Sequence, residues 1–152
     1  MRAVVSRVSS AGVTLRDGPR AGESRAIGQG LLILLGVGEQ DDEALAKKTA
    51  EKILGLRVFS NAEGKFDLSI SDTHGEILLV SQFTLYGSLK GGRRPDFTAA
   101  ARPEKARPLY ERVAAALAAS GLTVRTGEFG ASMAVESVND GPVTVWVDTD
   151  CF

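Results

Sequence analysis

The chain has 152 residues, a length typical of one folded domain, and we expect residues 1–152 to form a single domain. Hydrophobic residues make up 43% and charged residues 24% of the chain, a composition that excludes an intrinsically disordered protein. The formal net charge of −1 argues against a protein coated in nucleic acid, and the only cysteine, Cys151, rules out an internal disulfide framework.

The apolar pattern predicts neither a membrane segment nor a secretory leader. The longest apolar run, residues 31–37, is interrupted by Gly36 and is far shorter than the roughly 20 residues that span a bilayer. Arg2 and Arg7 stand where a signal peptide needs an apolar core. Because a single cysteine also suits a reducing compartment, we expect a cytoplasmic protein.

The first third of the chain has strand and helix patterns in turn. Residues 2–8 and 11–16 alternate in the manner of strands and predict a hairpin with its turn near residues 9–12. Residues 16–24, rich in charge, glycine and proline, predict an exposed connection. The apolar run 31–35 lies between glycines and predicts a central strand buried on both faces.

A helix is expected after this strand, with Asp41 or Asp42 as its N-cap and its end near Gly55. Its apolar stripe consists of Ala46, Ala50, Ile53 and Leu54.

The middle of the chain predicts a turn at residues 61–64 and a strand within residues 75–86. Strand alternation in this segment places Gln82 and Thr84 on one face and Ser81 and Phe83 on the other. An exposed strand face explains these polar residues as readily as a functional site does.

A second helix is expected from Pro103 to a position just before Gly121. Its apolar face consists of Leu109, Val113, Ala116 and Leu117. Pro108 removes one helical hydrogen bond, so the alternative is a regular helix that begins only at residues 107–108.

The last part of the chain predicts strands near residues 123–126, 131–138 and 143–147, with residues 139–142 as the turn between the last two. Strands therefore dominate and two main helices are expected. The predicted architecture is a mixed α/β domain with a curved, barrel-like sheet.

The common catalytic and cofactor motifs are missing from this pattern. Gly36 and Gly38 precede a helix as in a dinucleotide-binding loop, but Asp41 stands where the third glycine belongs. The only histidine, His74, lies in a polar turn, and the scattered acids form no short-spaced metal cluster. We predict no cofactor and no metal, and expect any catalysis to depend on backbone groups, hydroxyls or the substrate itself.

Positive charge is concentrated between Lys90 and Arg112, where seven basic residues face three acidic ones, a surplus of four. A solvated surface is one interpretation of this stretch, and contact with a nucleic-acid backbone is the other.

Five short segments give the chain a family resemblance: residues 1–4, 81–86, 93–97, 126–133 and 139–144. Among them, Ser-Gln-Phe-Thr-Leu at 81–85 and Asn-Asp-Gly-Pro-Val-Thr at 139–144 resemble the two signatures of the D-aminoacyl-tRNA deacylases. The resemblance runs nearly end to end. Departures are confined to loops, at residues 16–28 and 90–94.

This resemblance implies a homodimeric hydrolase that cleaves the ester of D-aminoacyl-tRNA, and of mischarged glycyl-tRNA, while it rejects L-aminoacyl-tRNA. It implies that Ser81, Gln82, Phe83 and Thr84 form the catalytic pocket for the terminal adenosine and aminoacyl group. The family mechanism uses the ribose 2′-hydroxyl of the substrate to assist water attack, so Thr84 would position groups rather than act as nucleophile.

The resemblance also assigns Gly141 and Pro142 to a cis Gly-Pro element that enters the partner subunit's pocket and excludes L side chains. Phe129, Ala131 and Met133 match a pocket-lining segment, although a role as ordinary core residues is equally consistent with the sequence. Arg93 and Arg94 are candidate tRNA contacts.

Two other function classes remain open at this point. A non-catalytic tRNA-binding module would keep the basic stretch without needing the Gly-Pro signature. A Thr84-dependent general esterase would keep the pocket without needing RNA.

Overall fold

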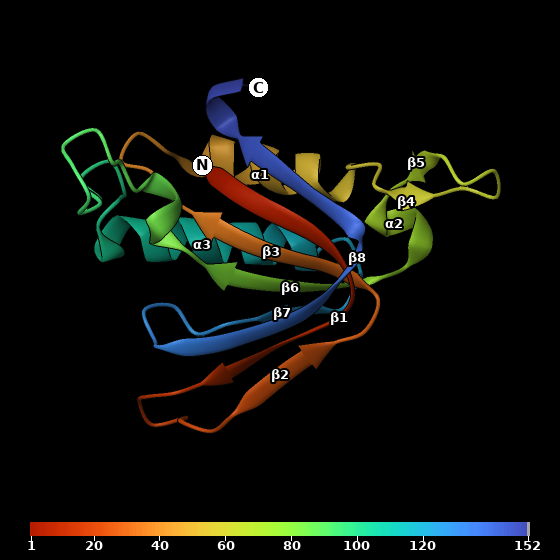
Figure 1. Cartoon of the computed structure of the whole chain (residues 1–152), viewed down its shortest axis with the longest axis horizontal. Coiled ribbons are helices and arrows are strands. Elements are labelled where there is room, and N and C mark those ends of the chain that lie inside the picture. The colour runs from red at the N-terminus through yellow and green to blue at the C-terminus, as the bar shows by residue number, and fades with distance from the viewer. Residues whose placement is uncertain (152) are drawn as a thin grey trace.

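The computed structural model describes residues 1–151, which form a mixed α/β fold with a nearly closed, barrel-like sheet (Figure 1). The strands are β1 Arg2–Leu15, β2 Ser24–Ile27, β3 Gly30–Gly36, β4 Phe59–Ser60, β5 Phe66–Leu68, β6 Glu76–Ser81, β7 Val124–Thr126 and β8 Met133–Asp148. The α-helices are α1 Glu43–Leu54, α2 Ile70–Thr73 and α3 Pro103–Ala118, and short 3-10 helices span Phe83–Tyr86 and Thr149–Cys151. No helix within residues 1–151 is long and apolar enough to cross a membrane.

The long strand β1 organises the main sheet. One of its edges pairs antiparallel with β3 and then with β2, and its other edge pairs antiparallel with β8. The sheet continues from β3 through β6 to β7 in parallel pairs. Strong curvature brings β2 back toward β7, where Arg25 donates hydrogen bonds to the carbonyls of Thr126 at 2.7 Å and Gly127 at 3.3 Å. Between β2 and β7 the barrel is therefore closed by the side chain of Arg25, and not by hydrogen bonds between paired strands.

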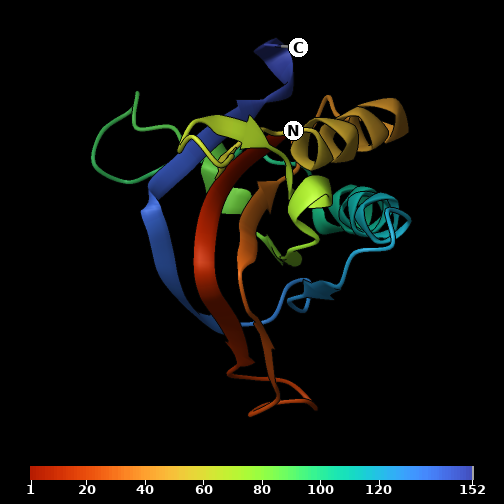
Figure 2. The same ribbon diagram turned by 90° about the vertical axis from the view of Figure 1, so that its right-hand side faces the viewer.

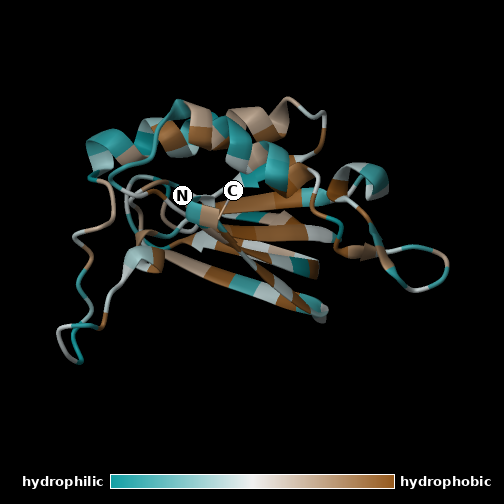
Figure 3. Cartoon of the chain, turned by 90° about the horizontal axis from the view of Figure 1, so that it is seen from above, coloured by the Kyte–Doolittle hydropathy of each residue, from teal (hydrophilic) through white to brown (hydrophobic). Residues whose placement is uncertain are grey.

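The two main helices, α1 and α3, cover one face of the sheet (Figure 2). Alternate residues of β3 explain the two-sided burial: Leu31, Ile33 and Leu35 pack in the core beneath the helices, and Leu32 packs in a second apolar cluster on the concave face. The strands are accordingly apolar along much of their length, while the helices keep polar residues on their outer sides (Figure 3). The prediction of a central strand buried on both faces is confirmed.

Helix α1 follows its expected boundaries. The side chain of Asp42, and not that of Asp41, caps it by accepting a hydrogen bond from the N–H of Leu45 at 2.8 Å, and Gly55 ends it. Helix α3 begins at Pro103 and continues through Pro108, so the alternative of a later start is wrong. Pro108 is exposed, and water can therefore reach the carbonyl that its missing N–H leaves free.

The predicted hairpin at residues 9–12 is wrong, because β1 runs unbroken from Arg2 to Leu15. Its pairing with β8 is irregular between Ser6 and Val8 and again between Val8 and Ser10. These irregularities bend the strand, so the small polar residues mark a bulge, not a turn.

The predicted turn at residues 139–142 is also a bulge. β8 pairs with the same strand before and after it, with Asn139 opposite Val8 and Thr144 opposite Ser6. The chain does not reverse direction here. Residues 140–143 of β8 have no paired residue on β1 and project from the sheet as a bulge.

The strand expected across residues 75–86 ends earlier than predicted. β6 stops at Ser81, and Phe83–Tyr86 form a 3-10 helix. Strand alternation therefore does not describe the orientations of Phe83 and Thr84, and that prediction is wrong.

Candidate active site

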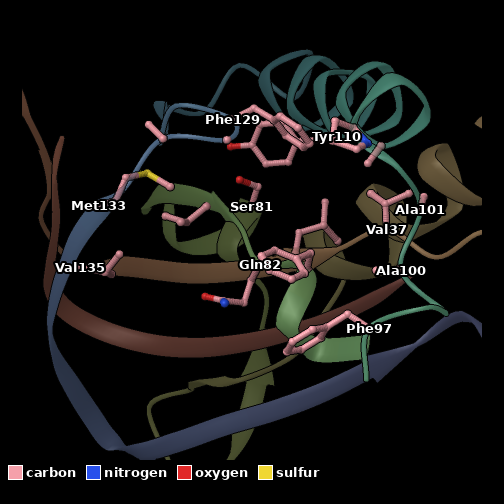
Figure 4. A pocket seen from close by; sticks show the side chains of 17 residues that line it. Val37, Ser81, Gln82, Phe97, Ala100, Ala101, Tyr110, Phe129, Met133 and Val135 are labelled. Atoms are coloured by element: carbon pink, nitrogen blue, oxygen red, sulfur yellow. The ribbon is translucent and has the colours of Figure 1, made fainter. Parts of the chain in front are cut away.

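The largest concentration of signature residues lies around a pocket of about 620 Å³ at the carboxyl ends of the parallel strands β3, β6 and β7 (Figure 4). Parallel strands end at the same edge of a sheet, and the loops that leave this edge commonly build binding sites. The first turns of α3 contribute Pro103, Ala106 and Tyr110 to the lining. The lining residues include Val37 after β3, Ser81 and Gln82 at the end of β6, Phe129 after β7, and Ala106 and Tyr110 on α3.

The segment of residues 81–84 turns sharply at the pocket floor. The N–H of Gln82 still pairs with the carbonyl of Leu35 at 2.8 Å, and directly afterwards the chain coils into the 3-10 helix. The side-chain amide of Gln82 donates a hydrogen bond to the hydroxyl of Thr84. Ser81, Gln82 and Phe83 line the pocket, whereas Thr84 lies next to it and is not part of its lining.

Aromatic rings form much of the pocket wall. Phe83, 58% exposed, meets the edge of Phe97 with ring centroids 5.1 Å apart. On the opposite wall the rings of Tyr110 and Phe129 lie 5.8 Å apart. A wall of this kind suits a ligand with a flat ring or an apolar side chain.

Tyr110 is the only titratable side chain among the lining residues of the described chain. Its hydroxyl donates to the carbonyl of Leu79 at 2.9 Å, and burial raises the pKa of this phenol. A phenol held protonated by its surroundings and committed to a backbone carbonyl is poorly suited to act as a general base. The pocket therefore offers shape, backbone groups and hydroxyls, with little acid–base capacity of its own.

The segment after β7 forms the upper wall. The N–H of Gly127 pairs with the carbonyl of Leu79 at 2.8 Å, and a Cβ at this glycine would lie 2.7 Å from the sulfur of Met133, so a larger residue here would displace the end of the Met133 side chain. Phe129, Ala131 and Met133 all line the pocket, and Figure 4 shows Met133 and Val135 on the β8 side of it.

Gly141 and Pro142 do not line the pocket of their own chain. Their peptide bond is cis, as the resemblance led us to expect, and both residues are exposed on the β8 bulge. Arg7 holds the base of this bulge: its Nε atom lies 3.1 Å from the carbonyl oxygen of Asp140 and 3.1 Å from its carboxylate. A second nitrogen of Arg7 donates to the carbonyl of Val58 at 2.6 Å.

The remaining candidates lie away from the pocket. Arg93 and Arg94 are exposed in a loop whose two arms pair through the backbone of Ser88 and Asp96. His74 is exposed at the end of α2, in the left-handed conformation with φ 51°. Within residues 1–151, no three His, Cys, Asp or Glu side chains are placed to hold a metal ion.

Sequence reasoning missed several lining residues, among them Val37, Phe97, Tyr110 and Val135. Tyr110 carried a usable signal, because it adjoins the apolar face of the expected second helix. Phe97 carried one as well, because it ends the resemblance segment 93–97. Val135 carried none, since only the folding of distant segments brings it to the pocket.

Comparisons with known proteins agree with this geometry. A family model described as D-Tyr-tRNA(Tyr) deacylase matches residues 4–148. A D-aminoacyl-tRNA deacylase of Symbiobacterium thermophilum is 54% identical over 150 residues, which cover 99% of this chain and 97% of that protein. A D-aminoacyl-tRNA deacylase of Roseiflexus castenholzii is 55% identical over 152 residues, which cover 100% of this chain and 94% of that protein.

Solved structures give the same result for the fold. One named c-Myc DNA Unwinding Element Binding Protein superposes with a TM-score of 0.88 at 40% identity and covers 98% of this chain and 99% of its own. A probable eukaryotic D-amino acid tRNA deacylase has a TM-score of 0.81 at 16% identity, with 96% and 97% of the two chains covered, and supports the fold alone. Because the family model matches residues 4–148 and two relatives are more than 50% identical over nearly the whole chain, this chain belongs to the D-Tyr-tRNA(Tyr) deacylase family.

Proposed function

We propose that this protein hydrolyses the ester bond of D-aminoacyl-tRNA to free D-amino acid and tRNA, and that it spares L-aminoacyl-tRNA. The observation that carries the proposal is the match over nearly the whole chain to D-aminoacyl-tRNA deacylases. The pocket at the end of β6 supports it, because Ser81, Gln82 and Phe83 of the first signature line it. We take residues 1–152 to act as one domain in the cytoplasm, where aminoacyl-tRNA is used.

An aminoacyl ester is already reactive, so positioning of water and stabilisation of the oxyanion are enough to accelerate its hydrolysis. The backbone N–H groups of Phe83 and Thr84 form no backbone hydrogen bond within residues 1–151 and stand at the start of a 3-10 helix beside the pocket. We assign them to the developing oxyanion. As in the mechanism that the family resemblance implies, we assign assistance of the attacking water to the ribose 2′-hydroxyl of the substrate. Among the lining residues within 1–151 only Tyr110 is titratable, and its hydroxyl is bonded to the carbonyl of Leu79.

Thr84 is a positioning residue in this proposal. Its hydroxyl has the side-chain amide of Gln82 as its partner, and an amide cannot take a proton from a nucleophile. We therefore disfavour the general esterase in which Thr84 attacks the ester.

Chiral selection would require a second copy of the chain. Gly141 and Pro142 are exposed on their own bulge, outside the pocket of their own chain, and would enter the pocket of a partner as a rigid backbone element. An L side chain would collide with that backbone, whereas a D side chain would point away from it.

The β8 strand supports a homodimer. It pairs only with β1 within the described chain, which leaves a 16-residue edge open, and it exposes Val138 at 58% and Trp146 at 52%. Long edges with exposed apolar residues are normally covered, here by a second copy.

One assay separates this proposal from its alternatives. The protein is incubated with D-aminoacyl-tRNA, with the matching L-aminoacyl-tRNA and with a simple D-amino acid ester. We expect turnover of the first alone. Turnover of the simple ester at a comparable rate would support the general esterase, and binding of tRNA without any turnover would support the non-catalytic module.

The role of the substrate is tested with a D-aminoacyl-tRNA that ends in 2′-deoxyadenosine and carries the amino acid on its 3′-oxygen. We expect it to bind normally and to be hydrolysed at least about a hundredfold more slowly, the usual loss when a catalytic acid–base group is removed. Normal turnover of this substrate would mean that a protein side chain, and not the 2′-hydroxyl, assists the attacking water.

Glycyl-tRNA tests the exclusion mechanism. Glycine has no side chain to collide with Gly141 and Pro142, so the protein is expected to hydrolyse glycyl-tRNA. Strict sparing of glycyl-tRNA would mean that selection depends on contacts with the D side chain.

A further inference from the structure

A buried polar cluster lies directly behind the 3-10 helix that carries Phe83 and Thr84. At its centre is Asp41, only 6% exposed, in the connection between β3 and α1. One carboxylate oxygen of Asp41 lies 2.5 Å from the amino group of Met1. The other oxygen accepts hydrogen bonds from the N–H of Gly38 at 2.6 Å and from the hydroxyl of Tyr86 at 3.3 Å. Hydrogen bonds from several donors fix the position of this buried carboxylate, so it can anchor the groups that donate to it.

Tyr86, the last residue of the 3-10 helix, is the link from this cluster to the pocket. Burial, followed by the negative charge of Asp41, raises the pKa of the Tyr86 phenol, so the hydroxyl remains protonated and donates. The guanidinium of Arg2 lies 4.5 Å from the Tyr86 ring centroid and donates to the carbonyl of Leu85 at 3.3 Å. The end of the 3-10 helix is thus held through both its side chain and its backbone.

Gly38 provides the space that the Tyr86 ring occupies. A Cβ built on Gly38 would lie 2.6 Å from the Tyr86 hydroxyl oxygen and 2.7 Å from two of the ring carbons. The ring therefore packs directly against the backbone that also donates to Asp41.

The other end of the segment is fixed to β3. The N–H of Gln82 donates to the carbonyl of Leu35, and a Cβ on Gly36 would lie 2.9 Å from the carbonyl oxygen of Gln82. Between these two anchors, Phe83 and Thr84 have exposed side chains. Their backbone N–H groups consequently depend on the anchors at Gln82 and Tyr86 for their direction.

We propose that Tyr86, acting through its hydrogen bond to Asp41, is a positioning residue for the deacylation reaction, because it fixes the direction of the Phe83 and Thr84 N–H groups. This inference rests on the proposed function. It adds a residue that touches neither substrate nor reacting atoms and that acts only through the geometry of the 3-10 helix.

The kinetic test uses Tyr86→Phe, which removes one oxygen and keeps the ring against Gly38. Loss of a hydrogen bond to a charged group is expected to lower kcat for D-aminoacyl-tRNA by about tenfold or more. KM should change by less than about twofold, since a hydroxyl buried behind the segment contributes no direct contact to tRNA binding. Thr49→Val is the matched control: it removes a buried hydroxyl, bonded at 2.7 Å to the carbonyl of Leu45 on α1, and should leave kcat and KM unchanged.

A second measurement does not depend on catalysis. The amides of Leu85 and Gly87 donate to the carbonyls of Gln82 and Thr84 and so report on the 3-10 helix. In Tyr86→Phe, their hydrogen exchange should accelerate by about tenfold while core amides of β3 keep their parental protection. If the parent protein has no deacylase activity, the proposed function fails, and this measurement still decides whether Tyr86 anchors the segment.

Gly38→Ala disturbs the same contact between Gly38 and the Tyr86 ring, but from the Gly38 side. Its new methyl group requires the Tyr86 ring to move, so it should lower kcat and accelerate exchange at Leu85 and Gly87, as Tyr86→Phe does. Parental kcat in both variants would overturn the inference even if exchange accelerates, because the anchor would then not matter for the reaction. Parental exchange at both amides would overturn it as well.

Discussion

Individual residues of the pocket provide apolar walls and hydrogen-bonding groups but little acid–base capacity. Such a pocket is sufficient for an aminoacyl ester, because this substrate is already reactive. The one titratable lining residue, Tyr110, is committed to the carbonyl of Leu79. The hydroxyl of Thr84 is paired with Gln82. Histidine, the usual general base at neutral pH, is represented only by His74, which lies outside the pocket lining.

His74 therefore yields a prediction at this scale. His74→Ala should leave deacylation of D-aminoacyl-tRNA within about threefold of the parent, far from the 10²-fold or larger loss expected for a general base. His74→Gly should also raise the free energy of unfolding by up to about 1 kcal/mol, because φ 51° suits glycine better than histidine. Rates from a deacylation assay and midpoints from urea unfolding check the two parts. A hundredfold loss of activity would contradict the mechanism proposed above.

At the scale of elements, two prolines interrupt regular structure with different consequences. Pro142 lies on a bulge that β8 accommodates because β8 pairs with β1 on both sides of it. Pro108 lies inside α3, and the helix continues because this side is exposed to water.

Pro108→Ala should stabilise the protein. Alanine restores the N–H that can bond to the carbonyl of Glu104 and has the highest helix propensity, although it also loosens the unfolded chain. The expected gain is about 1–2 kcal/mol in the free energy of unfolding, measured by urea denaturation at unchanged m-value. A loss of stability would indicate that the proline ring packs against the protein more than its exposure suggests.

The β8 bulge depends on Arg7, whose side chain is only 11% exposed. Arg7→Lys keeps the charge but cannot reach Asp140 and Val58 together, because an ammonium is a point donor and not a fork. We expect a loss of about 1–3 kcal/mol in stability, and a drop of at least about tenfold in kcat/KM for D-aminoacyl-tRNA if the bulge enters the partner's pocket.

The control for this variant is Arg57→Lys. Arg57 pairs with Asp67 at 3.2 Å on the surface, with the two side chains 70% and 50% exposed, and its replacement should change stability by less than about 0.5 kcal/mol. Equal effects of the two lysine variants would mean that Arg7 is an ordinary surface residue.

At the scale of the whole molecule, the open β8 edge predicts a dimer. The parent protein should sediment as a dimer, and Trp146→Glu, which places a charge on the exposed apolar surface, should sediment as a monomer and lose deacylation. Trp146→Phe retains an apolar ring and should remain dimeric. A parent protein that sediments as a monomer and is active would contradict the cross-subunit role of Gly141 and Pro142.

Charge distribution is the other whole-molecule property. The chain has a net charge of −1, yet residues 90–112 carry a surplus of four positive charges. Replacing Arg93 and Arg94 with alanine should weaken tRNA binding and reduce the slope of log Kobs against log salt by up to about 0.7–0.9 per lost phosphate contact, with kcat at saturating tRNA largely kept. Filter binding at several salt concentrations measures the slope, and Arg57→Ala is the control. An unchanged slope would leave the two arginines as solvated loop residues.

Local patterns were sufficient for much of this fold. The run 31–35, the cap and stop of α1, the exposed loop 16–24 and the strand β7 follow from periodicity and from capping or breaking residues, which act within a few positions along the chain. The two signature segments were also identified from sequence alone, because their resemblance to a family is carried by consecutive residues.

The tertiary structure decided what depends on partners distant in sequence. Residues 9–12 and 139–142 have the composition of turns, but the pairing of β1 with β8 keeps both strands continuous: the β1 register is irregular only up to Ser10, and residues 139–142 lie at a bulge of β8. β6 ends at Ser81 because hydrogen bonds hold the chain beyond it against β3 and Asp41. Local residue propensities do not predict such contacts. The pocket likewise exists only where the ends of three parallel strands meet α3 and β8, since close packing of distant segments is a property of the folded chain as a whole.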